Sequence, residues 1–150
     1  MSLMNLPAPS HEASLCYEID RAKSLRVEEY RGVVGLEDIK ALTRAVTSDP
    51  GWSPDLNGLM DFSEAQLELS ADDVMRLALM WRAKEYRSSG WLAFAVPSAA
   101  AFGMMRMLGS WARVTERSKI FPNRAEAEHW LMEQGLRTPR YALPPVVASR

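Results

Sequence analysis

The chain has 150 residues, a length that suits one domain with a full hydrophobic core. Its 18 basic and 19 acidic residues give a net charge of −1, which argues against nucleic acid as a partner because nucleic-acid binders usually carry a basic excess. The single cysteine excludes an intramolecular disulfide and a cysteine-rich zinc site, and the lack of a long apolar run or a signal-peptide pattern predicts a cytoplasmic protein with no membrane span.

The first part of the sequence predicts a tail followed by a β-hairpin. Residues 1–13 contain two prolines and no periodic pattern, which indicates a flexible N-terminal tail. Apolar and polar residues alternate over Leu15–Asp20 and again over Leu25–Tyr30, with a short polar turn between them. Two alternating segments this close together are typical of an antiparallel hairpin, which we expect to end at Gly32–Gly35.

Two helices with a buried strand between them are predicted next. Apolar residues recur at helical spacing from Leu36 to Val46, and Asp49-Pro50-Gly51 ends this pattern. The short apolar segment Asn57–Phe62 predicts a buried strand. The second helix should begin after Ser70, a favourable N-cap with Asp73 at the capping-box position, and end at the Ser-Ser-Gly of residues 88–90.

A central strand and a third helix follow. The continuous apolar run Trp91–Val96 predicts a strand that is buried on both faces, and Pro97 ends it. Ser98 can cap the third helix, which should reach about Arg113.

The last predicted elements are a very short strand and a helix. Lys119–Phe121 predicts the strand, Pro122 and Asn123 start the helix, and Gly135 is its expected C-cap. Residues 136–150 contain three prolines and predict an extended C-terminal tail.

Together these elements predict one α/β domain over residues 14–135, in the order β-β-α-β-α-β-α-β-α. Single helices between strands favour right-handed crossovers, and therefore a mixed, mostly parallel five-stranded sheet with four helices. Ligands of such sheets usually bind beyond the carboxyl ends of the strands.

Four segments resemble a known family, and they are Asn57–Phe62, Leu92–Ser98, Phe102–Met107 and Ile120–Leu131. The last two are the more specific, a Phe-Gly-x-x-Arg-Met helix and a terminal Ala-x-x-Trp-Leu helix. In these segments and in the order of its elements, the chain is similar to the STAS fold of anti-sigma-factor antagonists, and most closely to a SpoIIAA-like group. The resemblance spans about residues 15–131 and implies a STAS (SpoIIAA-like) fold and a non-catalytic, protein-binding or regulatory domain.

The sequence departs from this family at the start of the second helix. Phospho-switched antagonists carry an Asp-Ser dipeptide and a nearby glycine there, whereas Ser70 lies between Leu69 and Ala71 with no glycine nearby. We therefore expect Ser70 to cap the helix and the phospho-switch to be missing.

The residue types point away from enzyme chemistry. A cysteine nucleophile needs a base within hydrogen-bond reach, and the expected topology places neither His11 nor His129 near Cys16, which should be packed and inert. Two distant histidines make a poor metal site, and the eight scattered glycines contain no phosphate-binding loop. We expect no catalysis, no metal and no cofactor.

Three groups of residues leave alternatives open. Asp61 and Glu64 either perform acid-base chemistry or order a turn and face solvent, and the second is favoured. The methionines of the third helix either fill the core, which is favoured, or cover an interface. Arg106, Arg113 and Arg117 either hold an anionic ligand or form a solvated surface, which is favoured.

The functional surface is predicted at the carboxyl ends of the third and fourth strands. Two helices begin there with free backbone N–H groups, and the loop of residues 63–69 either contacts a partner or covers the core. The expected partner- or ligand-binding residues are Asp61, Ser63, Ser70, Ser98, Phe102 and Arg106. A protein partner or a second copy of the chain in a homodimer is the expected occupant, and the alternative is a small apolar molecule or lipid carried in an apolar pocket.

Overall fold

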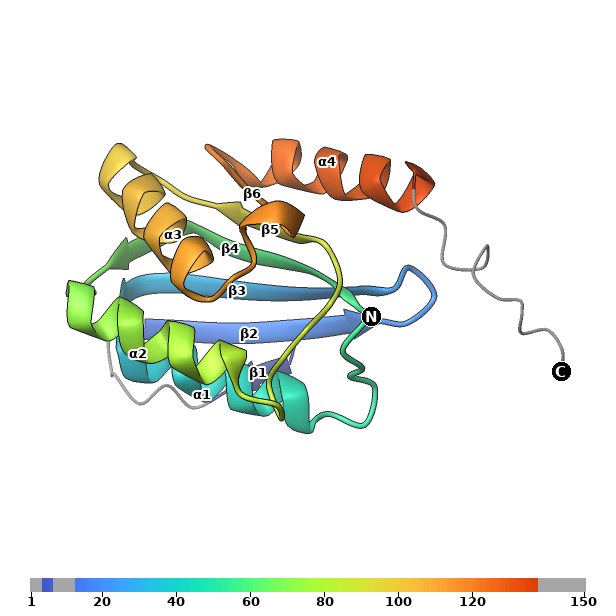
Figure 1. The fold of residues 1–150 in the computed structure, drawn as a ribbon, viewed down its shortest axis with the longest axis horizontal. Helices are drawn as coiled ribbons and strands as arrows, with labels where there is room; N and C mark the ends of the chain where they lie inside the picture. The colour runs from blue at the N-terminus through green and yellow to red at the C-terminus, as the bar shows by residue number, and fades with distance from the viewer. Residues whose placement is uncertain (1–3, 7–12, 138–150) are drawn as a thin grey trace, which may run out of the picture.

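One mixed sheet of six strands organises the computed structural model, which describes residues 4–6 and 13–137 (Figure 1). The strands are β1 (Met4–Leu6), β2 (Ala13–Asp20), β3 (Leu25–Val34), β4 (Asn57–Leu67), β5 (Leu92–Ala95) and β6 (Ser118–Phe121). They lie in the sheet in the order in which they occur in the chain. The first three strands pair antiparallel, and β3 to β6 run parallel.

Helices cover both faces of this sheet, three on one face and one on the other (Figure 1). The helices are α1 (Leu36–Ser48), α2 (Ala71–Arg82), α3 (Ala99–Trp111) and α4 (Arg124–Arg137), and a 3-10 turn, η1, spans Thr115–Arg117. The first three connect successive parallel strands that step across the sheet in one direction. Crossovers of one hand that step in one direction must all pass over the same face. Because α4 follows the last strand and is not a crossover, it is free to pack on the opposite face.

The larger hydrophobic core lies between the sheet and α1, α2 and α3. The rings of Tyr30 and Phe62 stack with their centroids 4.4 Å apart, and Trp81 stacks on Phe94 at 6.3 Å. Each large apolar side chain that is fully buried here contributes about 1.5–3 kcal/mol.

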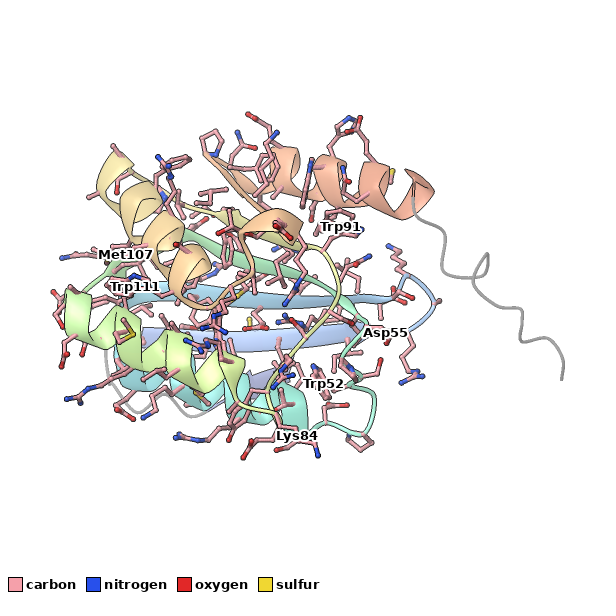
Figure 2. All side chains as sticks on the ribbon, viewed as in Figure 1. Trp52, Asp55, Lys84, Trp91, Met107 and Trp111 are labelled. Atoms are coloured by element: carbon pink, nitrogen blue, oxygen red, sulfur yellow. The ribbon has the colours of Figure 1, made fainter. Side chains whose placement is uncertain are left out.

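A smaller core lies under α4. Val27, Leu59 and Phe121 pack there with the inner face of the helix. Trp91 meets Trp130 of α4 edge to face, with a centroid distance of 5.9 Å, and Figure 2 shows Trp91 on the α4 side of the molecule. The sheet is therefore buried on both faces along β3, β4 and β5.

The predicted fold class and helix starts are confirmed. The structure has the expected mixed, mostly parallel sheet with four helices among the described residues. The Ser70 hydroxyl accepts a hydrogen bond from Asp73 N at 3.0 Å, and the Asp73 carboxylate accepts one from Ser70 N at 3.0 Å, as a capping box requires. The Ser98 hydroxyl likewise accepts from Ala101 N at 3.1 Å and caps α3.

Several predicted boundaries in the first half were wrong. The sheet has a sixth strand, β1, inside the region predicted as a tail. β3 continues past Tyr30 to Val34, with a positive φ of 79° at Gly32, although the hairpin does end within residues 32–35 as expected. β4 continues to Leu67, so most of the predicted loop of residues 63–69 is strand. A register shift opposite Glu29 and Arg31 adds one residue to β4, and this extra residue keeps the strand paired beyond Phe62.

Two helix ends also differ from prediction. α2 ends at Arg82 because Ala83 adopts an extended backbone, not at residues 88–90. α4 runs through Gly135 to Arg137, and the apolar Leu131 packs its last turns on the sheet, which outweighs the poor helix propensity of one glycine. The predicted tails over residues 1–3, 7–12 and 138–150 lie outside the described residues. No helix in the described part of the chain has the length and apolar character needed to cross a membrane.

Candidate functional site

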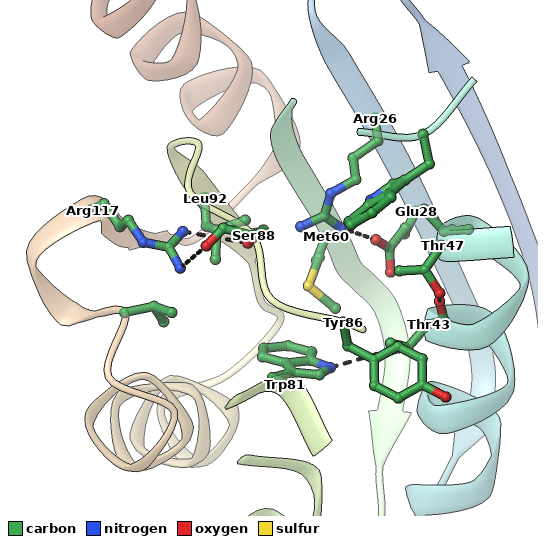
Figure 3. Close-up of a pocket in the computed structure, with 13 residues that line it drawn as sticks. Arg26, Glu28, Thr43, Thr47, Met60, Trp81, Tyr86, Ser88, Leu92 and Arg117 are labelled. Carbon is green, nitrogen blue, oxygen red and sulfur yellow. Dashed lines mark hydrogen bonds and ion pairs between the residues drawn. The ribbon is translucent and has the colours of Figure 1, made fainter. Parts of the chain in front are cut away.

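A pocket opens at the amino-terminal edge of the parallel strands (Figure 3). Arg26 and Leu92 line it from the starts of β3 and β5, Thr43 and Thr47 from the last turns of α1, and Trp81 from the end of α2. The space that a water-sized sphere can reach inside it is about 30 Å³, and the total empty volume of about 470 Å³ includes open solvent. This edge is opposite the arrowheads of the parallel strands β3 and β4 in Figure 1, and so opposite the edge that the sequence predicted as functional.

The floor of the pocket is a buried ion pair between neighbours on β3. Arg26 is 9% exposed and Glu28 is 1% exposed. Arg26 Nη1 donates to Glu28 Oε2, and the Tyr30 hydroxyl donates to Glu28 Oε1 at 2.9 Å. Burial of two charges costs several kcal/mol per ion, which the mutual attraction and the extra hydrogen bond offset. Arg26 Nε is also buried, and it has no hydrogen-bond partner among residues 4–6 and 13–137.

Glycine at position 58 makes room for the Arg26 guanidinium. Gly58 lies directly opposite Arg26 in the sheet. A Cβ atom at this position would lie 2.8 Å from Arg26 Cζ and 2.9 Å from a methyl carbon of Leu92. Any larger residue would displace the floor of the pocket.

Arg117 lies on the other side of the pocket. Its Nη1 donates to the carbonyl of Gly90 at 2.7 Å, and its Nη2 donates to the carbonyl of Ser88 at 2.6 Å. Burial lowers the pKa of Arg117, and the charge of Arg26 lowers it further. In Figure 3 the two guanidinium groups point toward each other across the pocket.

Aromatic side chains form part of the wall of the pocket. Trp81, Tyr86 and Trp52 all line the pocket. Trp81 Nε1 donates to the Thr43 hydroxyl at 3.2 Å, and that hydroxyl donates to the carbonyl of Ile39 at 2.9 Å. The hydrogen bonds hold the indole ring in one orientation, so the wall is formed in advance of any ligand.

The structure places the six residues predicted from sequence on different elements and on both faces of the sheet. Asp61 lies on the face that α4 covers, where its carboxylate accepts a hydrogen bond from Ser63 N at 2.9 Å and lies 3.4 Å from Arg124. The Asp61 carboxylate thus stabilises the irregular part of β4 that follows it. In the favoured interpretation of the sequence, Asp61 has this kind of role, but at a turn and not in a strand. Ser70 and Ser98 belong to helices on the other face.

The remaining predicted residues lie on the surface of α3. Phe102 is 41% exposed, and Arg106 is exposed one turn further along the helix. The predicted functional role of all six residues stays a prediction.

A second charged cluster lies under the start of α4. The Arg124 side chain donates to Glu29 of β3, and Glu29 also accepts a weak hydrogen bond from Cys16 Sγ at 3.5 Å. Burial raises the pKa of the Cys16 thiol, and the nearby Glu29 carboxylate raises it further. The environment therefore disfavours a reactive thiolate. Within residues 4–6 and 13–137, no three His, Cys, Asp or Glu side chains are grouped to hold a metal ion.

Arg26, Glu28 and Gly58 line or shape the pocket and were not predicted from the sequence. Alternation in β3 placed Leu25 and Val27 on the buried face and so placed Arg26 and Glu28 toward solvent. A usable signal was present, because a strand with helices on both sides has no solvent face, and two charges of opposite sign two residues apart can pair there.

The fold is that of a SpoIIAA-like α/β domain, as the resemblance predicted. An uncharacterised protein of the DUF3478 family with a SpoIIAA-like fold, from Shewanella loihica PV-4, is similar with a TM-score of 0.53 and 20% identity, over 84% of this chain and 98% of that chain. An anti-sigma factor antagonist from Mycobacterium paratuberculosis is similar with a TM-score of 0.48 and 17% identity, over 85% of this chain and 99% of that one. At 20% identity, the likeness to the Shewanella protein shows the fold. Neither protein-family models nor curated proteins match the sequence.

Proposed function

We propose that the chain is a non-catalytic binding domain of SpoIIAA-like fold that takes a small molecule into the pocket between Arg26 and Arg117. The observation that carries this proposal is the buried, unpartnered Arg26 Nε at a partly enclosed space with aromatic walls. An unmet buried donor costs about 1–3 kcal/mol, and a ligand acceptor would recover that cost. Ligand pockets typically combine apolar walls with a few polar groups in this way.

The chemistry of the pocket supports a binding role over a catalytic one. The hydroxyls of Thr43 and Thr47 donate to helix carbonyls, and Glu28 already accepts two hydrogen bonds. Cys16, whose pKa is raised, lies in the separate cluster under α4. These groups are held in structural hydrogen bonds, which disfavours a role as nucleophile or general base.

A matched pair of variants on α1 tests the proposal. Thr47 lines the pocket, whereas its neighbour Ser48 is exposed and does not line it. Thr47→Phe should fill the pocket, and Ser48→Phe should leave it open. In a thermal-shift screen against a library of small metabolites, compounds that stabilise the wild type should also stabilise S48F but not T47F. If no compound separates T47F from the wild type, the proposal is wrong.

A second candidate function is protein binding on α2 and α3, as the family resemblance implied. Met75 and Leu79 are 36% and 54% exposed on α2, and Phe102 is exposed on α3. Large exposed apolar side chains favour a contact surface. This candidate includes four expectations from the sequence, which are a homodimer, a regulatory role, a cytoplasmic location and the lack of a phospho-switch. Sedimentation of the wild type and of Leu79→Asp would test self-association. A monomeric wild type would contradict the homodimer.

A further inference from the structure

The pocket opens beside a second hollow that is rich in arginine. Trp81, Ser88 and Arg117 border both spaces. Arg82, Arg87 and Arg113 also line the second hollow, and none of the residues described as lining it is acidic. In a protein with a net charge of −1, this concentration of one sign is a local feature that the overall composition does not explain.

The balance of charge among the residues that line the two spaces stays positive when the helix ends that face them are included. Five arginines line them, and Glu28 is the one carboxylate among the described lining residues. The carboxyl-terminal ends of α1, α2 and α3 face this edge, and each contributes about half a negative charge. Those partial charges and Glu28 together neutralise about half of the five cations.

The hydrogen bonds of these arginines leave donors available. Arg117 donates to the carbonyls of Ser88 and Gly90, and Arg87 donates to the carbonyl of Arg82 at 3.4 Å. A guanidinium has five N–H donors, so these bonds use only part of each group. The buried Arg26 Nε–H is unpartnered.

Arg113 stands where the backbone favours a different residue. Its φ is +64°, in the left-handed region, and it directly follows the C-cap residue of α3. Glycine or asparagine is the usual choice at this position, because a Cβ atom is disfavoured there. A strained arginine that lines an arginine-rich hollow suggests that the side chain has a role.

We propose that the ligand of the pocket is a small organic oxyanion, a phosphate or carboxylate group on a flat apolar body. The anion would lie beside Arg117, where the pocket meets the hollow, with the body in the hollow against Trp81. Arg82, Arg87 and Arg113 would attract it there. This inference rests on the proposed function. Guanidinium groups bind carboxylate and phosphate oxygens in pairs of hydrogen bonds, and aromatic rings stack on flat ligands.

Four probes and one matched pair of variants test this inference. The probes are phenyl phosphate, benzoate, benzyl alcohol and inorganic phosphate, titrated calorimetrically into the wild type. Arg113→Gln and Arg44→Gln each remove one exposed arginine at the same cost in net charge, but only Arg113 lines the hollow. Phenyl phosphate or benzoate should bind, benzyl alcohol should bind at least about tenfold more weakly, and added salt should weaken the anions. R113Q should weaken anion binding about threefold to tenfold, and R44Q less than twofold.

The outcomes separate this inference from the proposed function. The affinities of phenyl phosphate and benzoate, compared, tell which oxyanion the site prefers. If inorganic phosphate binds as tightly as phenyl phosphate, the proposal that the ligand carries a flat apolar body is wrong. If neutral compounds bind as well as the anions and T47F abolishes their binding, the oxyanion inference is wrong and the proposed function stands. If no probe binds at up to about 10 mM, a range that covers weak ligands, the inference is wrong. The metabolite screen with T47F then decides the proposed function separately.

Discussion

The buried side chains of Arg26 and Glu28 stabilise each other on the floor of the pocket. Arg26 and Glu28 are buried together, and Tyr30 supplies the second hydrogen bond to the carboxylate. Neither charge is tolerable there alone, because an uncompensated buried ion costs several kcal/mol. The pair thus links the integrity of the pocket floor to the stability of the whole domain.

Removal of the Glu28 charge should destabilise the protein strongly. Glu28→Gln leaves Arg26 without a counter-charge and should lower the free energy of unfolding by about 3 kcal/mol. The double variant R26M/E28Q removes both charges, keeps an acceptor for Tyr30, and should recover most of the loss. Urea unfolding measures both. A double variant that is less stable than the single one would contradict this account.

Tyr17 should make stability depend on pH in the alkaline range. Its hydroxyl donates to Asp49 at 2.7 Å, and burial first, then Asp49, raise its pKa to about 12 from the ordinary value of 10. Between these values the folded chain keeps the proton and the unfolded chain loses it. The free energy of unfolding should therefore fall as pH rises, with a limit of about 1.4 kcal/mol per pH unit for one proton.

Urea unfolding at about pH 9 and about pH 11, compared with Tyr17→Phe, checks this prediction. The variant should be less stable at neutral pH, because the bond to Asp49 is lost, but its stability should fall less over the alkaline window. A remaining decline is expected from Tyr30, because burial raises its pKa well above 10. An identical pH dependence in Y17F and the wild type would contradict the assignment.

At the scale of single residues, the sequence predicted caps better than buried charges. Ser70, Asp73 and Ser98 act through neighbours three residues away, so local sequence is enough to predict them. Arg26 and Arg117 lie on the same pocket only because β3 and η1 come together in the folded chain. No local pattern contains that information.

At the scale of elements, the ends of the helices allow the clearest predictions of the free energy of unfolding. Arg113, which ends α3 in the left-handed region, should be a site of strain. Arg113→Gly should raise the free energy of unfolding by about 0.5–1 kcal/mol, since glycine adopts this conformation without a Cβ clash. The matched change Arg106→Gly, inside α3, should lower it by about 1 kcal/mol. Destabilisation by R113G would show that the side chain, not the backbone, dominates there.

The cap of α2 should contribute a typical amount. Ser70→Ala removes the acceptor for Asp73 N and should cost about 1 kcal/mol. Ser70→Asp can still accept that bond and should stay near the wild type. Denaturant midpoints of both variants give the comparison. If S70A kept full stability while S70D changed the binding of a partner, Ser70 would act as a switch and not as a cap.

Element identities were predictable from periodicity, whereas several boundaries were not. Strand β4 extends past Phe62 because a bulge opposite Tyr30 corrects its register, and the sequence around Ser63 looks like a polar loop. Strand β1 is three residues long and pairs with β2 in a segment that has prolines and no pattern of its own. Pairing partners, not local propensity, determine both segments.

Over the whole molecule, α4 is held to the sheet by an apolar stripe and by one arginine. Burial lowers the pKa of Arg124, but hydrogen bonds to Glu128 and Glu29 more than offset this, so its pKa is raised. Glu29 and Asp61 are both nearly buried beside it. Arg124 therefore neutralises the carboxylates that the sheet presents to this helix.

Loss of that contact should loosen α4 more than the rest of the fold. Arg124→Gln should lower the free energy of unfolding by about 2 kcal/mol, because a hydrogen bond to a buried carboxylate is lost. Glu128→Gln removes only the exposed partner and should cost less than about 0.5 kcal/mol. Hydrogen exchange should be faster in α4 of R124Q than in α2. Uniform exchange across the helices would contradict a local role.

The strand order has a consequence for synthesis on the ribosome. Each new strand pairs with the strand made just before it, so the sheet can grow from β2 and β3 outward without waiting for a distant segment. The face that carries Val27, Leu59 and Ala93 is the exception, because it stays uncovered until α4 emerges. A nascent chain that ends before Arg124 should therefore expose an apolar face of the sheet and bind chaperones. Binding of a hydrophobic dye to stalled chains of increasing length should drop once α4 is complete.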